Sequence, residues 1–116
     1  MTTRQQGQNA ETQVYDYLQQ QGLKPLARNV RSPRGEIDLI MEEGDTVVFI
    51  EVRLRTRTDF GSGAESVTRS KQIKLIATAA YFLQQNKRLS KRPARFDVVS
   101  VSSQENMDWI KNAFEV

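Results

Sequence analysis

Two stretches of the chain carry apolar residues at helical spacing. The first, over residues 9–21, predicts a helix with one apolar stripe. Asn9 can serve as its N-cap and Gly22 as the residue that ends it. The polar residues 1–8 are expected to be flexible, ahead of a single domain over residues 9–116. The apolar positions of this helix are Ala10, Val14, Tyr17 and Leu18.

The second helical stretch is longer. We expect it to begin after a cap at Ser66 or Thr68 and to end near Asn86. Lys71 and Lys74 lie one turn apart on a face separate from its apolar positions. The residues predicted to share the apolar face are Ile73, Ile76, Ala77, Ala80 and Leu83.

Strand patterns fill most of the remaining chain. We expect strands over residues 23–30, 36–41, 46–54 and 95–102, and a short edge strand over residues 108–114. Turn residues separate the first three, and residues 55–67 are predicted to form a loop. The element order αβββαβ, with the final edge strand, predicts an α/β fold with a mixed central sheet flanked by helices.

Composition excludes several kinds of site. The chain contains no cysteine and no histidine, so zinc sites of the Cys or His kind and catalytic triads with a His base are excluded. A bound metal would be a hard cation held by carboxylate and carbonyl oxygens, such as Mg²⁺, Mn²⁺ or Ca²⁺.

Length and hydropathy favour one small cytoplasmic domain. A chain of 116 residues is typical of a single domain. The sequence has no run of about 18 uncharged apolar residues that could span a membrane. It also lacks an apolar segment for export at its N-terminus. We therefore expect no membrane role.

Positive charge is concentrated in one part of the chain. Residues 53–95 contain eleven Lys or Arg residues and only two acids, Asp59 and Glu65. Such a concentration suits a polyanion such as nucleic acid. An equally open reading is that the part over residues 87–95 is a solvated helix end with its loop.

Carboxylates on two adjacent strands form a candidate catalytic site. Strand alternation places Glu36 and Asp38 on one face of the second strand, and Glu51 and Arg53 on one face of the third. A hairpin turn at Gly44-Asp45 puts Asp38 opposite Glu51, whereas a turn at Glu43-Gly44 puts Glu36 there. Both registers gather the four side chains on one face.

Two readings of this cluster stay open. The first reading is that the acids and Arg53 form cross-strand charge pairs on a solvated sheet face, an arrangement that is common. However, Glu51 lies within the apolar run Val47-Val48-Phe49-Ile50-Glu51-Val52, where a carboxylate without a role would carry a desolvation cost. Converging acids also repel one another unless a cation lies between them. The second reading is a divalent-metal site.

Short motifs spread over about residues 7–114 form a specific combination. They are Gly7…Ala10-Glu11, Leu26-Ala27-Arg28-Asn29, Gly35-Glu36-Ile37-Asp38-Leu39-Ile40, Phe49-Ile50-Glu51-Val52-Arg53-Leu54-Arg55, Phe60-Gly61, Glu65-Ser66-Val67, Lys71…Lys74-Leu75 and Arg95-Phe96-Asp97-Val98-Val99. In these motifs the chain resembles the bacterial YraN family. That family is similar to archaeal Holliday junction resolvases, so the resemblance implies a restriction-endonuclease-like fold with a PD-(D/E)xK site.

The resemblance assigns roles residue by residue. Asp38 and Glu51 match the metal-binding Asp and Glu of the motif, and Val52 matches the residue whose carbonyl also binds metal. Arg53 falls at the position of the motif lysine, where it keeps the positive charge but cannot serve as a base. Glu11 matches an additional acid near the metal, although it also suits the first turn of a helix.

We therefore expect a Mg²⁺-dependent, or Mn²⁺-dependent, endonuclease that acts on DNA, with branched or recombination-intermediate DNA as substrate and a homodimer as the active form. The alternatives are a nucleic-acid-binding protein that has lost hydrolysis and a protein–protein adaptor. Residues 55–67 are expected to be a mobile loop that orders on substrate, in which Phe60 packs into the core or stacks on a base. The expected metal ligands are Asp38, Glu51, Val52 and Glu36, and the expected nucleic-acid contacts are Arg55, Arg57, Lys71, Lys74, Arg31 and Arg34.

Overall fold

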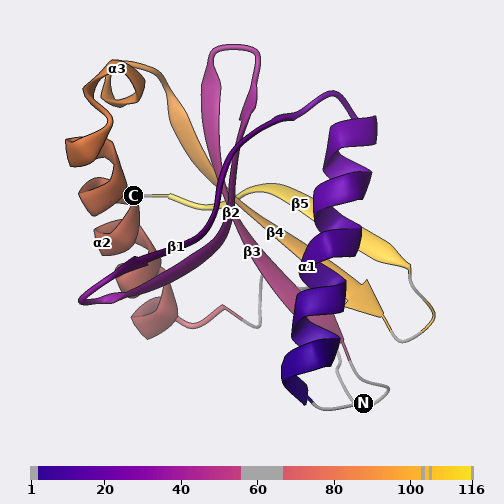
Figure 1. The fold of residues 1–116 in the computed structure, drawn as a ribbon. Helices are drawn as coiled ribbons and strands as arrows, with labels where there is room; N and C mark the ends of the chain where they lie inside the picture. Colours follow the sequence, from indigo (N-terminus) through magenta and orange to yellow (C-terminus); the bar gives the residue numbers. More distant parts are fainter. Residues whose placement is uncertain (1–2, 56–66, 103, 105, 116) are drawn as a thin grey trace.

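A five-stranded mixed sheet lies between helices on its two faces (Figure 1). The computed structural model describes residues 3–55, 67–102, 104 and 106–115, with side chains from residue 9 onward. The elements are α1 (Thr3–Gln20), β1 (Lys24–Ser32), β2 (Gly35–Glu43), β3 (Thr46–Arg55), α2 (Arg69–Gln85), α3 (Lys87–Ser90), β4 (Ala94–Ser102) and β5 (Met107–Phe114). The predicted α/β class, with a sheet like that of a restriction-endonuclease core, is confirmed.

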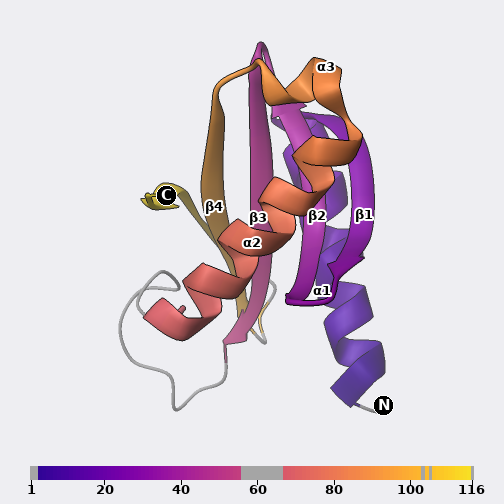
Figure 2. The same ribbon diagram turned by 90° about the vertical axis from the view of Figure 1, so that its left-hand side faces the viewer.

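The strands follow chain order, β1-β2-β3-β4-β5. Three neighbouring pairs are antiparallel, and β3 and β4 are parallel. A parallel pair needs a long crossover, because the chain must return to the same end of the sheet. The connection here contains α2, which lies on the opposite face from α1 (Figure 2).

Helix α1 begins earlier than its apolar pattern indicates. It starts at Thr3, so Asn9 is a helical residue and the prediction of Asn9 as N-cap is wrong. The residues before Asn9 include several glutamines, which are good helix formers without any apolar stripe. The predicted end is confirmed. Gly22 has a φ of 99°, and the Gly22 and Leu23 N–H groups donate to Gln19 and Leu18, as in a Schellman motif.

Two apolar clusters lie on either side of the sheet. On the α1 side, Ala10, Val14 and Leu18 pack against β2, β3 and β4 as predicted. On the α2 side, Leu75 and Ala79 pack against the sheet.

The predicted apolar face of α2 is wrong in part. Ile73 is exposed, with 44% of its surface accessible, and Ala80 is also exposed. Apolar residues occur almost all round this helix, so periodicity could not choose among its faces. The predicted cap at Thr68 is confirmed, because its side chain accepts a hydrogen bond from Lys71 N.

Strand alternation is interrupted in β2, next to the candidate site. Leu39 belongs to the cluster on the α1 side, whereas both Ile37 and Ile40 belong to the cluster on the α2 side. Glu36, next to Ile37, therefore lies on the α1 side, whereas Glu51 has the parity of Val47 and Phe49 on the α2 side, so the prediction that Glu36 shares a face with Glu51 is wrong. On β1, Asn29 lies between the partners of Leu39 and Ile37, and its φ is 52°. This left-handed conformation of Asn29 interrupts the regular alternation of β1, at the point where β1 pairs with β2 between Leu39 and Ile37.

Other predicted boundaries agree with the structure within a few residues. Strand β5 confirms the expected edge strand at the C-terminal end, while the short helix α3 was not predicted. The expected mobile loop, with Arg57 and Phe60, lies for the most part outside the described residues. In the described part of the chain, no helix has both the length and the hydropathy needed to cross a membrane.

Candidate metal and phosphate site

The β2–β3 hairpin brings Asp38 and Glu51 together. Glu43 pairs with Thr46, so the two turn residues are Gly44 and Asp45, the first of the two predicted registers. Pairing continues to Leu39 and Ile50, and the next positions along the two strands are Asp38 and Glu51. The Asp38 Oδ2 atom accepts a 2.9 Å hydrogen bond from Val52 N, which fixes this carboxylate against β3.

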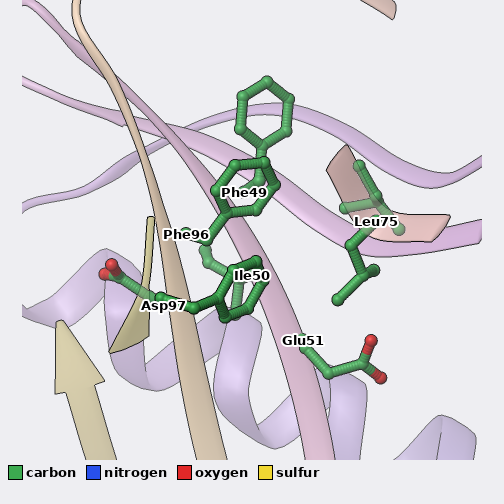
Figure 3. Close-up of a pocket in the computed structure, with 8 residues that line it drawn as sticks. Phe49, Ile50, Glu51, Leu75, Phe96 and Asp97 are labelled. Carbon is green, nitrogen blue, oxygen red and sulfur yellow. The ribbon is translucent and has the colours of Figure 1, made fainter. Parts of the chain in front are cut away.

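Glu51 is buried with one oxygen unpaired. Only 7% of its side chain is exposed, and its Oε2 atom has no hydrogen-bond partner among the described residues. Its side chain points toward α2, below Leu75 (Figure 3). An unsatisfied buried carboxylate oxygen is costly, so this arrangement needs a compensating group.

The pKa values of both carboxyl groups reflect this environment. Burial, followed by the charge of Asp38, raises the pKa of Glu51 from an ordinary value of 4.5 to about 8. Burial also raises the pKa of Asp38, although the hydrogen bond from Val52 N opposes the change. The interaction between the two carboxyl groups adds to the rise in the pKa of Glu51 and opposes the rise in that of Asp38. The pair therefore has a strong affinity for a positive charge.

A second acidic group lies beside Asp38, between α1 and β1. In the amide orientation that satisfies both acids, Asn29 Nδ2 donates to Glu11 Oε1 at 2.9 Å and to Glu36 Oε1 at 3.1 Å. Glu36 also pairs with Arg31 at 3.6 Å. Burial, followed by the charge of Asp38, raises the pKa of Glu11 to about 7. Glu11 is thus close enough to Asp38 for the two charges to interact, and its role as an additional acid near a metal stays a prediction.

Two cations reach Glu51 from different elements. Lys71, on α2, has its Nζ atom 3.8 Å from Glu51 Oε2. The charge of Arg53, on β3, also lowers the pKa of Glu51. Lys71 was expected only as a nucleic-acid contact. Its approach to the carboxylates depends on how α2 packs across the sheet, and sequence spacing does not give that.

Further basic residues gather near the turn between β1 and β2. Gly35, at this turn, is so close to α2 that an added Cβ would lie 3.4 Å from the Cβ of Lys74. A 2.9 Å hydrogen bond between Ser32 Oγ and Thr78 Oγ1 also joins the end of β1 to α2. Lys74 and Arg34, the residue before Gly35, are both exposed.

Three further arginines pair with acids. Arg55 pairs with Asp108 on β5 at 3.8 Å. Arg92 and Arg95 pair with Glu42 and Glu43 of the β2–β3 hairpin, at 2.7 Å and 2.9 Å. These two arginines of the basic run are therefore in part-buried ion pairs, and neither is a solvated charge at a helix end.

The donor set fits a hard divalent cation. In the described ranges no group of three or more His, Cys, Asp or Glu residues is arranged so that it could hold a metal ion by itself. Mg²⁺ does not need one, because it keeps several waters and is commonly held by one or two carboxylates together with substrate phosphates. Asp38 and the unpaired oxygen of Glu51 can supply those carboxylates. The expected Val52 carbonyl ligand and a direct contact from Glu36 stay predictions.

Sequence comparison places the chain in a defined family. The uncharacterised protein family UPF0102 matches residues 10–101. A UPF0102 protein of Pseudomonas fluorescens is 48% identical over 96% of this chain and 93% of its own. One from Saccharophagus degradans is 49% identical, over 93% and 91%, and one from Pseudomonas aeruginosa is 44% identical, over 98% and 95%. The chain therefore belongs to UPF0102, the YraN family.

Proposed function

We propose that this protein is a metal-dependent phosphodiesterase that acts on DNA. The observation that carries the proposal is the buried Glu51, whose Oε2 atom lacks a hydrogen-bond partner among the described residues while Asp38 lies beside it. Nearly every buried carboxylate oxygen has a hydrogen-bond donor, so the unsatisfied Glu51 oxygen beside a second carboxylate supports a cation-binding role.

The residues around the pair suit phosphodiester hydrolysis. Asp38 and Glu51 would hold the cation, and Val52 N keeps Asp38 oriented through its hydrogen bond. When bound, Mg²⁺ or Mn²⁺ lowers the pKa of water and neutralises phosphate charge. Arg53 supplies fixed positive charge close to Glu51. Glu11, with its raised pKa, can exchange a proton near neutral pH.

DNA is the proposed substrate because exposed cations flank the acids. Lys74 is exposed on α2 beside the Gly35 backbone, and Arg34, which precedes Gly35, is also exposed. Phosphate contacts from such residues would make binding strongly dependent on salt. We extend the proposal to branched DNA and a homodimer through the resemblance to resolvases, since a four-way junction presents two equivalent strands.

Arg53 favours a second candidate function. An arginine at the motif lysine keeps its charge at all accessible pH values and cannot accept a proton. A protein that binds metal and DNA without hydrolysing the phosphodiester bond would have the same acids and the same basic surface. This alternative predicts DNA affinity with no cleavage.

Two measurements on the same protein test the proposal. Mg²⁺ or Mn²⁺ at about 100 times its Kd should raise the melting temperature by on the order of 10 °C. Labelled single-stranded, duplex, flap and four-way DNA should then be tested for cleavage with each metal. Asp38→Asn should lose both effects, while Asp16→Asn, at an exposed carboxylate on α1, should keep both. Metal-independent stability together with intact DNA would overturn the proposal.

A further inference from the structure

Lys71 occupies a fixed position at the start of α2. It is the third residue of the helix, and its backbone N–H donates to the capping Thr68 Oγ1 at 3.1 Å. On either side, Val67 and Leu75 are buried in the cluster between α2 and the sheet. Gln72 Nε2 also donates to the Val67 carbonyl at 3.1 Å. These contacts hold the Lys71 backbone close to the sheet.

The Lys71 side chain lies between the buried carboxylates and the outside. Its Nζ atom is 3.8 Å from Glu51 Oε2, which is too far for a hydrogen bond, and its side chain is 42% exposed while that of Glu51 is 7% exposed. The charge of Lys71 acts on both Asp38 and Glu51. A phosphate that approaches the acids from solvent would therefore meet this ammonium group.

The ammonium group has two alternative counter-charges. Without a metal, it lies next to Glu51 and partly compensates the unpaired oxygen. A divalent cation held by Asp38 and Glu51 would repel the ammonium group, and a phosphate beside that cation would attract it. The first N–H groups of α2 also favour a phosphate at this end of the helix.

We propose that Lys71, reaching in from α2, supplies the lysine that contacts the reacting phosphate, while Arg53 occupies the strand position of the motif lysine. This inference rests on the proposed function and adds a catalytic residue to it. Lys71 thus has a role distinct from that of Lys74, which lies one turn later on the same helix and binds DNA at the surface.

Matched variants on one helix test this assignment. Lys71→Met keeps most of the side-chain volume and removes the charge, and Lys74→Met does the same at the exposed position. For Lys71→Met we expect kcat to fall by about 100-fold or more, as for loss of one transition-state contact. Its metal-induced rise in melting temperature should be equal to or larger than that of the wild type, because a like charge has been removed from the metal site. Lys74→Met should change KM more than kcat.

The outcomes separate this inference from the proposed function. Wild-type protein that cleaves no DNA with Mg²⁺ or Mn²⁺ would overturn both. Cleavage by the wild type that Lys71→Met retains would overturn only the role of Lys71. A weaker metal-induced shift in Lys71→Met would also contradict it, because that result indicates a structural role. The melting temperature of each metal-free variant identifies any folding defect. Lys71→Arg, which restores the charge, should fold normally and recover part of kcat.

Discussion

Two buried carboxylates on the neighbouring strands β3 and β4 have opposite environments. Asp97 is opposite Ile50, one position from Glu51 in the parallel register, and the two side chains leave the sheet in opposite directions (Figure 3). Asp97 is fully buried. It accepts hydrogen bonds from Arg95 Nε at 3.0 Å, Trp109 Nε1 at 2.9 Å and Asn112 N at 2.9 Å.

The acids around Arg95 show that hydrogen-bond donors within this protein can satisfy a carboxylate. Arg95 also pairs with Glu43, and its hydrogen bond holds the pKa of Glu43 below its usual range. Glu51 shows the opposite behaviour, because burial and Asp38 raise its pKa to about 8. Asp97 is thus satisfied by protein donors, whereas one oxygen of Glu51 has no hydrogen-bond partner among the described residues.

The largest expected effect is the loss of the Asp97 network. Asp97→Asn removes the charge that Arg95 faces and replaces an acceptor with an amide donor. We expect the free energy of unfolding to fall by about 3–5 kcal/mol, as when one partner of a buried ion pair is removed. Urea denaturation measures this change. A loss below about 1 kcal/mol would mean that the two carboxylates are energetically alike, which would break the comparison.

Glu51→Gln should have the opposite sign in the absence of metal. The neutral amide removes a carboxylate that repels Asp38 and is poorly satisfied. We expect the free energy of unfolding to rise by about 1–3 kcal/mol at pH 8. The same variant should lose stabilisation by Mg²⁺. Destabilisation of the metal-free variant would show that Glu51 is structural, like Asp97.

The gain from Glu51→Gln should depend on pH. Below pH 4.5, Glu51 is protonated in both the folded and unfolded states and has no effect. Between pH 4.5 and about 8 the unfolded state ionises while the folded state keeps its proton, so the stability of the wild type falls as pH rises. The raised pKa values of Glu11 and Asp38 act in the same direction. Melting of both proteins from pH 4 to 9 should show the gain growing over this range.

The smallest expected effect concerns Asn29, which links Glu11 and Glu36. Its φ of 52° is tolerated by Asn and Gly but strained for Ala. Asn29→Ala should therefore lower the free energy of unfolding by about 1 kcal/mol more than Asn29→Gly does. Equal losses in urea denaturation would show that the amide contacts, and not the backbone conformation, determine the stability at this position.

Local chemistry in the sequence was enough for much of the fold. The apolar spacing of Ala10, Val14 and Leu18 identified the buried side of α1, and Gly22 identified its end. Gly44-Asp45 gave one of two possible hairpin turns, and both kept Asp38 near Glu51. These features follow from interactions between residues close in sequence, where periodicity and turn preferences are strong.

Long-range packing decided the rest. Four features were not predicted, or were predicted wrongly, from the sequence: the buried face of α2, the left-handed Asn29, the approach of Lys71 to Glu51 and the Asp97 network. Each depends on side chains that meet from elements far apart in the chain, and an exposed lysine has the same local pattern as one that reaches a buried acid. The sequence by itself therefore determined which carboxylates share a hairpin. Only the tertiary structure decided that Asp97 receives protein donors while one oxygen of the buried Glu51 has no hydrogen-bond partner among the described residues.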